Sequence, residues 1–495
     1  MNKHHTIRVL LFLAISLGVV WAQSDSGQQP SGDATPSNTA QQPGDATPSS
    51  TAPQPAFGQN GPTAQPADNP PLSGLDQPSL EPGFLARSFL IPGVHVSESA
   101  DSNVGGSTGS SAVHSVTRAG GSLALQKLWN HYTTTLDYIG GAAFYSGIGR
   151  SNSVLQELNA DERVQWRTGQ LILRDSFAYE PEGTFGYGSF GGSGGYPGGS
   201  VGGIGGGVGG GLGGGIAGGG GGFFGGGQLG SLGQQPRINN LTLAEIAEAL
   251  TPRSQVTLTG GYGFTDYIDN TQGLINSEHV SLQVGYNHQI SRHDQIGLVA
   301  GFQGFRYPIT AAGNFNTYLW HVLYGHRITG RLDLVAGGGP QLTIIHSALF
   351  GDFQRLSVSG RASLRYRLPK GSMSLEFSRY TTSGSGFFAG ANTNLARLSY
   401  SRPLGRNWEA VADIGYAHNS RLQQSLLGVN ATSYQYGYIG GSMRRQLGRY
   451  FSGVISYQFH DLSFDGGAFS TGSHVSQRHV ALIGLDWHPR PIRLD

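Results

Sequence analysis

Apolar and polar residues alternate along most of the chain after residue 250. In one run the apolar positions are Val280, Leu282, Val284 and Tyr286, and the positions between them are Ser281, Gln283, Gly285 and Asn287. A second run, over residues 356–366, alternates in the same way, with serine and arginine on its polar side. Successive side chains of a β-strand point to opposite faces, so each run predicts a strand with one apolar and one polar face.

Tight turns recur at intervals of about 40 residues. They lie near residues 252–253, 292–293, 329–330, 370–371, 404–405 and 447–448. Propeller repeats have a similar period but hold four short strands, whereas each interval here holds two long runs joined by a polar loop. About 9–11 tilted strand residues cross a bilayer, so these hairpins predict an all-β, up-and-down antiparallel transmembrane barrel, with its apolar face against lipid.

The runs predict about 18 strands, an even number, as bacterial barrels have. They cover residues 88–101, 114–128, 133–145, 161–167, 169–179, 238–250, 253–268, 277–290, 294–308, 313–328, 331–346, 352–368, 371–384, 388–402, 406–420, 431–446, 449–465 and 475–489. Residues 238–250 favour a helix by propensity, but the short turn after them favours a strand. A helix there, with the first strand unused, would leave about 16 strands.

The segments before the barrel are typical of an exported protein. Residues 1–22 resemble a signal peptide, with Lys3 and Arg8 ahead of a short apolar core and Ala22 at the expected cleavage site. Residues 23–87 are rich in Pro, Gln, Ser and Thr, and such a composition predicts a disordered linker.

The barrel domain is predicted over residues 88–489, followed by a short tail at 490–495. Within it, residues 181–237 are so rich in glycine that we expect a long extracellular loop. This loop could be solvated, could fold into the pore, or could act as a surface adhesive segment.

Composition excludes several functions. Lys and Arg total 31 and Asp and Glu 30, a balance that gives no electrostatic argument for nucleic acid binding. The chain has no cysteine, and its Gly-x-Gly-x-x-Gly matches lack the strand-to-helix context of a nucleotide site. We therefore predict no catalytic, metal or cofactor site and no enzyme activity.

Strand parity places a set of polar residues inside the barrel. The candidate pore-lining residues are Gln283, Arg355, Arg361, Arg365, Arg367, Glu376, Arg397, Glu409, Asp413, Gln458 and His460. Such side chains set ion and solute preference in a water-filled bore. Alternatively, the arginines and carboxylates pair across strands and only hold a narrow bore in shape.

Aromatic residues fall on the opposite, lipid-facing side. The candidate girdle residues are Tyr318, Trp320, Tyr324, Tyr400, Tyr416, Phe451, Tyr457 and Trp487. Aromatic girdles anchor barrels at the two membrane interfaces. Alternatively, these residues pack against neighbouring subunits.

The last strand alternates Ala481, Ile483 and Leu485 up to Trp487, and residues 488–495 follow it. This ending resembles the signal that barrel-assembly machinery recognises in outer-membrane barrels. Over residues 88–489 the chain resembles bacterial outer-membrane, porin-like barrels. The resemblance implies a bacterial outer-membrane location, contact with membrane lipid, and passage of small hydrophilic solutes, with arginines favouring anions or sugars.

Other functions fit the same pattern. The barrel could export an acidic polysaccharide, or it could display the Gly-rich loop for surface adhesion or a structural role. The sequence leaves open whether the bore is plugged and whether the protein forms a homo-oligomer.

Overall fold

The computed structural model describes the barrel and one short segment that precedes it. The described residues are 71–75, 88–104, 112–146, 152–180, 236–268, 274–308, 313–347, 351–384, 386, 388–423, 431–465 and 475–494. The predicted signal peptide, most of the predicted linker and the Gly-rich tract 181–235 lie outside these residues.

The described residues form eighteen long strands and one short one. They are β1 (Phe89–Asp101), β2 (His114–Leu128), β3 (Tyr132–Tyr145), β4 (Ser153–Gln165), β5 (Gly169–Glu180), β6 (Arg237–Thr251), β7 (Ser254–Tyr267), β8 (Ser277–Gln289), β9 (Asp294–Arg306), β10 (Asn314–Thr329), β11 (Leu332–Ser347), β12 (Gly351–Leu368), β13 (Gly371–Thr382), β14 (Ala391–Pro403), β15 (Trp408–Arg421), β16 (Ser433–Gln446), β17 (Phe451–Phe464), β18 (Val475–Trp487) and β19 (Ile492–Arg493).

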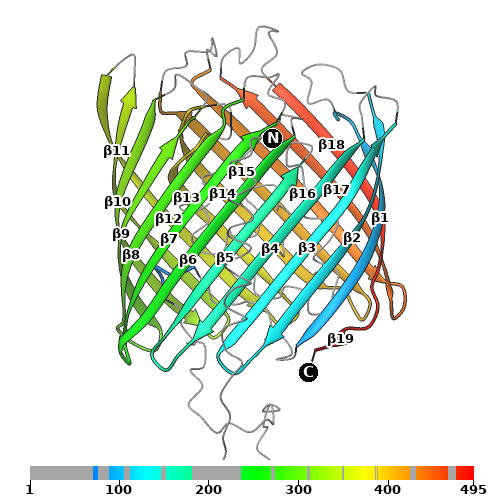
Figure 1. Ribbon diagram of the computed structural model, residues 1–495, viewed down its shortest axis with the longest axis horizontal. Helices are drawn as coiled ribbons and strands as arrows, with labels where there is room; N and C mark the ends of the chain where they lie inside the picture. The colour runs from blue at the N-terminus through cyan, green and yellow to red at the C-terminus, as the bar shows by residue number, and fades with distance from the viewer. Residues whose placement is uncertain are drawn as a thin grey trace, which may run out of the picture. The chain divides into compact units, whose positions relative to one another are not determined.

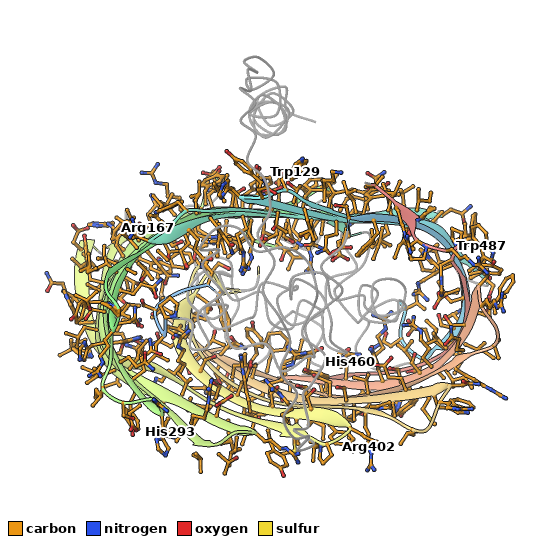
Figure 2. All side chains as sticks on the ribbon, turned by 90° about the horizontal axis from the view of Figure 1, so that it is seen from below. Trp129, Arg167, His293, Arg402, His460 and Trp487 are labelled. Atoms are coloured by element: carbon orange, nitrogen blue, oxygen red, sulfur yellow. The ribbon has the colours of Figure 1, made fainter. Side chains whose placement is uncertain are left out.

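The strands close into a barrel, seen from the side as a wall of tilted arrows in Figure 1 and from the end as an oval ring in Figure 2. Each long strand pairs antiparallel with the next, and β1 pairs with β18 from Val94↔Trp487 to Asp101↔Val480. Closure leaves no long unpaired edge, which would be costly in lipid. The prediction of an antiparallel barrel with 18 rather than 16 long strands is confirmed.

The segment with helical propensity is strand β6. It pairs along its length with β5 and β7. Leu243, Glu245 and Ala247 are buried on one face, whereas Ile246 is exposed on the other. The alternation fits a closed sheet, and pairing on both sides outweighs the weak intrinsic preference for helix.

The fourth strand lies further upstream than the sequence predicts. We expected residues 161–167, but β4 covers Ser153–Gln165 and pairs with β3 from Ala143 to Tyr132. The alternation is interrupted there, because Leu155 is buried on the inner face and polar Gln156 is exposed on the outer face. Pairing with β3, rather than the local pattern, sets the start of this strand.

The short connections gather at one end of the barrel, the lower end in Figure 1, where β19 also lies. There β19 extends the closure by pairing Ile492 with Leu90. Short turns face the periplasm in barrels of this kind. The part of the chain that the structure describes contains no helix long and apolar enough to cross a membrane.

Candidate functional site: the inner wall of the barrel

The two faces of the barrel wall differ in exposure and in chemistry. On β8, Val280, Leu282 and Val284 are 49%, 48% and 47% exposed on the outer face, while Ser281 and Gln283 are buried on the inner face. An outer surface of exposed valine and leucine matches lipid rather than water. The protein is thus a transmembrane barrel of the bacterial outer-membrane type, and its inner wall is the candidate functional site.

The aromatic residues expected on the lipid side divide into two groups. Trp320, Tyr324, Tyr416, Phe451, Tyr457 and Trp487 are exposed, whereas Tyr318 and Tyr400 are half-buried. Figure 2 shows Trp487 on the outside of the ring. Their action as a girdle stays a prediction.

Sequence reasoning missed three tryptophans at the short-turn end. Trp129 and Trp166 lie in the turns after β2 and β4, and Trp408 begins β15, beneath the Arg445 guanidinium at 5.3 Å. Trp487, at the end of β18, lies at the same barrel end. The available signal was tryptophan next to a tight turn, where indoles anchor a barrel at the membrane interface.

Charged residues from four consecutive strands form a row on the inner wall. Arg365 of β12 lies 3.6 Å from Glu376 of β13. Arg397 of β14 donates from Nε to Asp413 of β15 at 2.9 Å, and its Nη2 lies at the same distance. We call Arg365, Glu376, Arg397 and Asp413 the charged row.

Two further buried ion pairs lie on the inner wall outside this row. Arg478 of β18 forks onto Asp101 of β1, with Nε at 3.0 and 2.9 Å from the two carboxylate oxygens. Arg174 of β5 lies 2.7 Å from Asp161 of β4. Cross-strand pairing, one of the two sequence-based alternatives, is therefore present; it holds each guanidinium in a fixed orientation.

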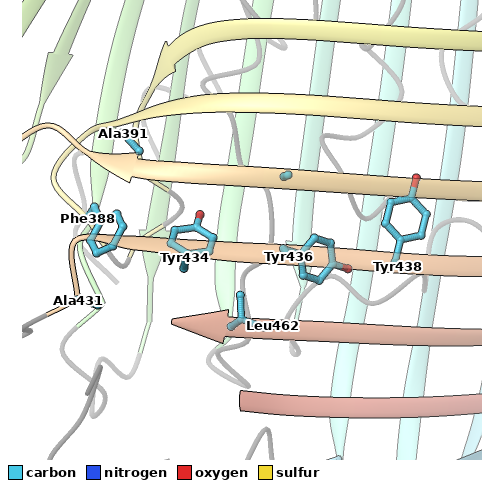
Figure 3. Close-up of a cluster of buried hydrophobic side chains, with 8 residues drawn as sticks. Phe388, Ala391, Ala431, Tyr434, Tyr436, Tyr438 and Leu462 are labelled. Atoms are coloured by element: carbon cyan, nitrogen blue, oxygen red, sulfur yellow. The ribbon is translucent and has the colours of Figure 1, made fainter. Parts of the chain in front are cut away.

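Three tyrosines follow one another on the inner face of β16 (Figure 3). Tyr434, Tyr436 and Tyr438 are all buried. The Tyr436 hydroxyl lies 2.8 Å from Nδ1 of His460, and the Tyr438 hydroxyl donates to Asp413. We call Tyr434, Tyr436 and Tyr438 the tyrosine ladder. Through the bond from Tyr438 to Asp413, the ladder lies next to the charged row.

The candidate pore-lining residues take three kinds of position. Gln283, Arg365, Asp413, Gln458 and His460 are buried in the wall. Arg361, Glu376 and Arg397 are half-buried, and Arg355, Arg367 and Glu409 are exposed toward strand ends. Figure 2 shows His460 on the inside of the ring. The charged row brings together Arg365, Glu376, Arg397 and Asp413.

We expected a polar inner wall, but part of the wall is apolar. Leu243, Val299, Leu319 and Leu323 are buried on the inner faces of β6, β9 and β10. On β10 both faces are therefore apolar, since Trp320 and Val322 are exposed on the outside. The residues that cover this patch are Leu72 and Leu75 of the segment before β1.

No protein-family model matches the chain. No curated protein sequence matches it either.

Several solved barrels are similar in structure. OpdK, an outer-membrane protein of Pseudomonas aeruginosa, is 10% identical with a TM-score of 0.39, over 81% of this chain and 99% of its own. OccK2 (OpdF) of the same organism, in complex with glucuronate, is 10% identical with a TM-score of 0.41, over 82% of this chain and 100% of its own.

The ferric-catecholate import receptor Fiu of E. coli K12 is also similar. It is 8% identical with a TM-score of 0.37, over 80% of this chain and 81% of its own. Likenesses this distant carry no argument about function, which must come from the wall itself.

Proposed function

We propose that the protein is an outer-membrane channel that passes small hydrophilic solutes, with a preference for anions and sugars. The observation that carries the proposal is the inner wall from β12 to β18, where oriented arginines stand beside a ladder of tyrosines. Charged and polar side chains lining a bore set which solutes enter and leave.

The arginines supply the preference for anions. A guanidinium is always charged and offers five N–H donors in a planar fork that matches the oxygens of carboxylates and phosphates. Arg361 differs from the charged row, because among the described residues no carboxylate lies within ion-pair distance of it. Its guanidinium instead donates a hydrogen bond to the carbonyl of Leu72, in the segment before β1.

The tyrosines supply the preference for sugars. An aromatic ring offers an apolar face and, in tyrosine, a polar tip, which together match the C–H faces and hydroxyls of a sugar. Tyr436 and Tyr438 have their rings 6.1 Å apart and about parallel, at 29° between planes. The two buried rings therefore form one stacked strip along the inner face of β16.

The test is single-channel conductance in a planar bilayer. Both the full chain and a variant without residues 71–75 are measured, because this segment lies inside the barrel. We expect stable steps with anion selectivity. A correctly inserted, heat-modifiable barrel that is silent in both forms would overturn the channel.

Solute preference is tested separately by liposome swelling with sugars, sugar acids and amino acids of similar size. The variant Tyr436→Ala should slow uptake of sugars relative to amino acids. Equal slowing of every solute would show only a structural role for this tyrosine.

The remaining partners follow from the barrel. Its outer face contacts membrane lipid, and we propose that the last strand, ending at Trp487, is recognised by barrel-assembly machinery. The pore-lining and girdle roles, the absence of enzyme activity, and a homo-oligomer stay predictions. Polysaccharide export and surface adhesion remain hypotheses, and the Gly-rich loop on which adhesion depends lies outside the described residues.

A further inference from the structure

A five-residue segment, Pro71–Leu75, lies inside the barrel against its wall, visible as the short blue piece at the left in Figures 1 and 2. Ser73 and Leu75 are 1% and 2% exposed. The segment belongs to the region that composition predicted as linker, and nothing in the sequence analysis anticipated its position. Its contacts come from strands β6 to β13.

Ser73 is the most densely bonded residue of the segment. Its backbone N–H donates to Asn287 Oδ1 at 3.2 Å, and its carbonyl accepts from Gln283 Nε2 at 2.7 Å. Its hydroxyl oxygen accepts a hydrogen bond from Asn287 Nδ2 at 2.5 Å. The same oxygen lies 2.5 Å from the hydroxyl oxygen of Thr257. Side chains of β7 and β8 thus form hydrogen bonds with both the backbone and the side chain of Ser73.

The residues on either side are held by charged groups. The N–H of Leu75 donates to Oε2 of Glu245 on β6 at 2.5 Å, and Thr259 donates to the same carboxylate oxygen at 3.3 Å. The carbonyl of Leu72 accepts a hydrogen bond from Arg361 on β12. Hydrogen bonds to charged groups are the stronger kind, and the segment spans a wall carboxylate and a wall guanidinium.

The two leucines cover the apolar part of the wall. Leu72 and Leu75 pack in one cluster with Leu241, Leu243, Val299, Leu319, Leu323 and Tyr380. Inward-facing leucines would be costly against water and are covered by the leucines of the segment. The apolar contacts and the hydrogen bonds therefore favour the same position of the segment against the wall.

The wall also lacks side chains where the segment approaches most closely. A Cβ atom at Gly285 of β8 would overlap the side chain of Ser73, and one at Gly325 of β10 would lie 2.8 Å from Leu72 Cδ2. Gly260 of β7, by contrast, has open space around its missing Cβ. The two wall glycines leave room for the segment.

We propose that the inner wall of β6 to β12 is a binding site for the chain's own segment Pro71–Leu75, which acts as an internal plug. The binding site stands on the contacts above; the plug rests on the proposed channel function. The site forms hydrogen bonds to backbone groups of residues 72–75 and packs against the two leucines. It would therefore also bind a free peptide with the sequence Leu-Ser-Gly-Leu. A tethered segment competes at an effective concentration of about millimolar, so a free peptide must reach that range.

Seating is tested without reference to conductance. The chain has no cysteine, so Ser73→Cys with Thr257→Cys introduces a single pair at positions whose hydroxyl oxygens are 2.5 Å apart. With an added copper–phenanthroline oxidant, we expect a disulfide in most folded molecules, seen as a mass loss of two hydrogens and a gel shift reversed by reductant. The control pairs Ser73→Cys with Ser456→Cys on β17, which should remain reduced. Equal cross-linking of both pairs, or of neither in a heat-modifiable barrel, would overturn the site.

Plugging is tested by conductance. Deleting Pro71–Leu75, or substituting Gly285→Ala, should raise conductance several-fold, whereas Gly260→Ala should behave as the wild type. Adding the peptide Pro-Leu-Ser-Gly-Leu to the deletion variant should restore the block at about millimolar concentration, and the reversed sequence should not. A deletion variant that conducts like the wild type would overturn the plug. If the cross-link forms but no variant conducts, the binding site holds and the channel function fails.

Discussion

The barrel wall has two arcs that satisfy their buried polar groups in different ways. In the arc β12–β18, which we call the charged arc, Arg365, Arg397 and Arg478 each find a carboxylate on a neighbouring strand. In the arc β6–β11, the segment-binding arc, wall groups such as Glu245 and Asn287 bond instead to the segment 71–75, and Arg361 of β12 bonds to it at the junction of the two arcs. Buried polar groups need partners, and in a barrel these come from the wall or from a separate piece of chain.

Removing a carboxylate from the charged arc should have the largest effect on stability, because this arc depends on pairing between its own side chains. The variant Asp413→Ala should destabilise the barrel by about 3 kcal/mol, because it removes the fully buried carboxylate that lies 2.9 Å from the half-buried Arg397 guanidinium. It also removes the acceptor of the Tyr438 hydroxyl. The free energy of unfolding in urea measures this.

Asp352→Ala is the matched control. Asp352 also pairs with a side chain of a neighbouring strand, His346 at 3.0 Å, but its own side chain is 68% exposed, whereas that of Asp413 is fully buried. Exposed pairs contribute little to stability, so this variant should stay near the wild type. An Asp413→Ala variant no less stable than Asp352→Ala would contradict the self-paired charged arc.

A cavity in the segment-binding arc has the next largest effect. Leu243→Ala should cost about 2 kcal/mol in the full chain, since the side chain is fully buried in the cluster with Leu75. In a chain without residues 71–75 the cost should be clearly smaller, because the partner is already absent. Leu298→Ala, on the lipid face of β9, should cost the same in both chains. Equal costs for Leu243→Ala in the two backgrounds would show that the segment does not stabilise this arc.

The fold was predictable from sequence because its signal is local. Alternation within each run gives the strand, and tight turns give the antiparallel order, so even β6 was recovered against its helical propensity. Where alternation is interrupted, as at Leu155 and Gln156, the boundary of β4 was wrong. There the register of β4 depends on its pairing with β3, and the sequence of residues 153–165 alone does not reveal that pairing.

The inner wall was only partly predictable. Parity brought Arg365, Glu376, Arg397 and Asp413 to one face, and the structure joins them in one row. Parity could not show that Leu319 and Leu323 face inward, since both faces of β10 are apolar. The seat of Ser73 depends on side chains 184 and 214 residues away, and a low-complexity segment has no periodicity that reports such contacts.

Ion selectivity sharpens the comparison at the junction of the arcs. In the chain without residues 71–75, Arg361→Gln should shift the reversal potential toward cations, because this charge has no carboxylate partner among the described residues. The double variant Arg397→Gln with Asp413→Asn removes a charge of each sign and should leave selectivity nearly unchanged. Salt-gradient measurements in planar bilayers decide between them. Equal shifts would mean that pairing does not neutralise the charged row.

The smallest expected effect lies outside the membrane, above the charged arc. Burial alone would raise the pKa of the Asp465 carboxyl. Hydrogen bonds from the backbone and hydroxyls of Ser433 and Thr432 outweigh it, so the pKa lies below its ordinary value of 3.8. The Thr432 amide donates to this carboxylate at 2.8 Å, joining the loop before β16 to the loop after β17.

The sign of the pH dependence follows from that direction. A carboxyl with a lower pKa in the folded state contributes stability that is fully present above 3.8 and is lost as pH falls through the folded value. Asp465→Asn should therefore lower the urea midpoint slightly at neutral pH, and the difference should shrink as the pH falls below 3.8. Thr432→Val, which removes one donor, should give the same trend with a smaller amplitude. A difference between Asp465→Asn and wild type that does not shrink on acidification would show that the carboxylate charge does not hold these loops, and that only its shape does.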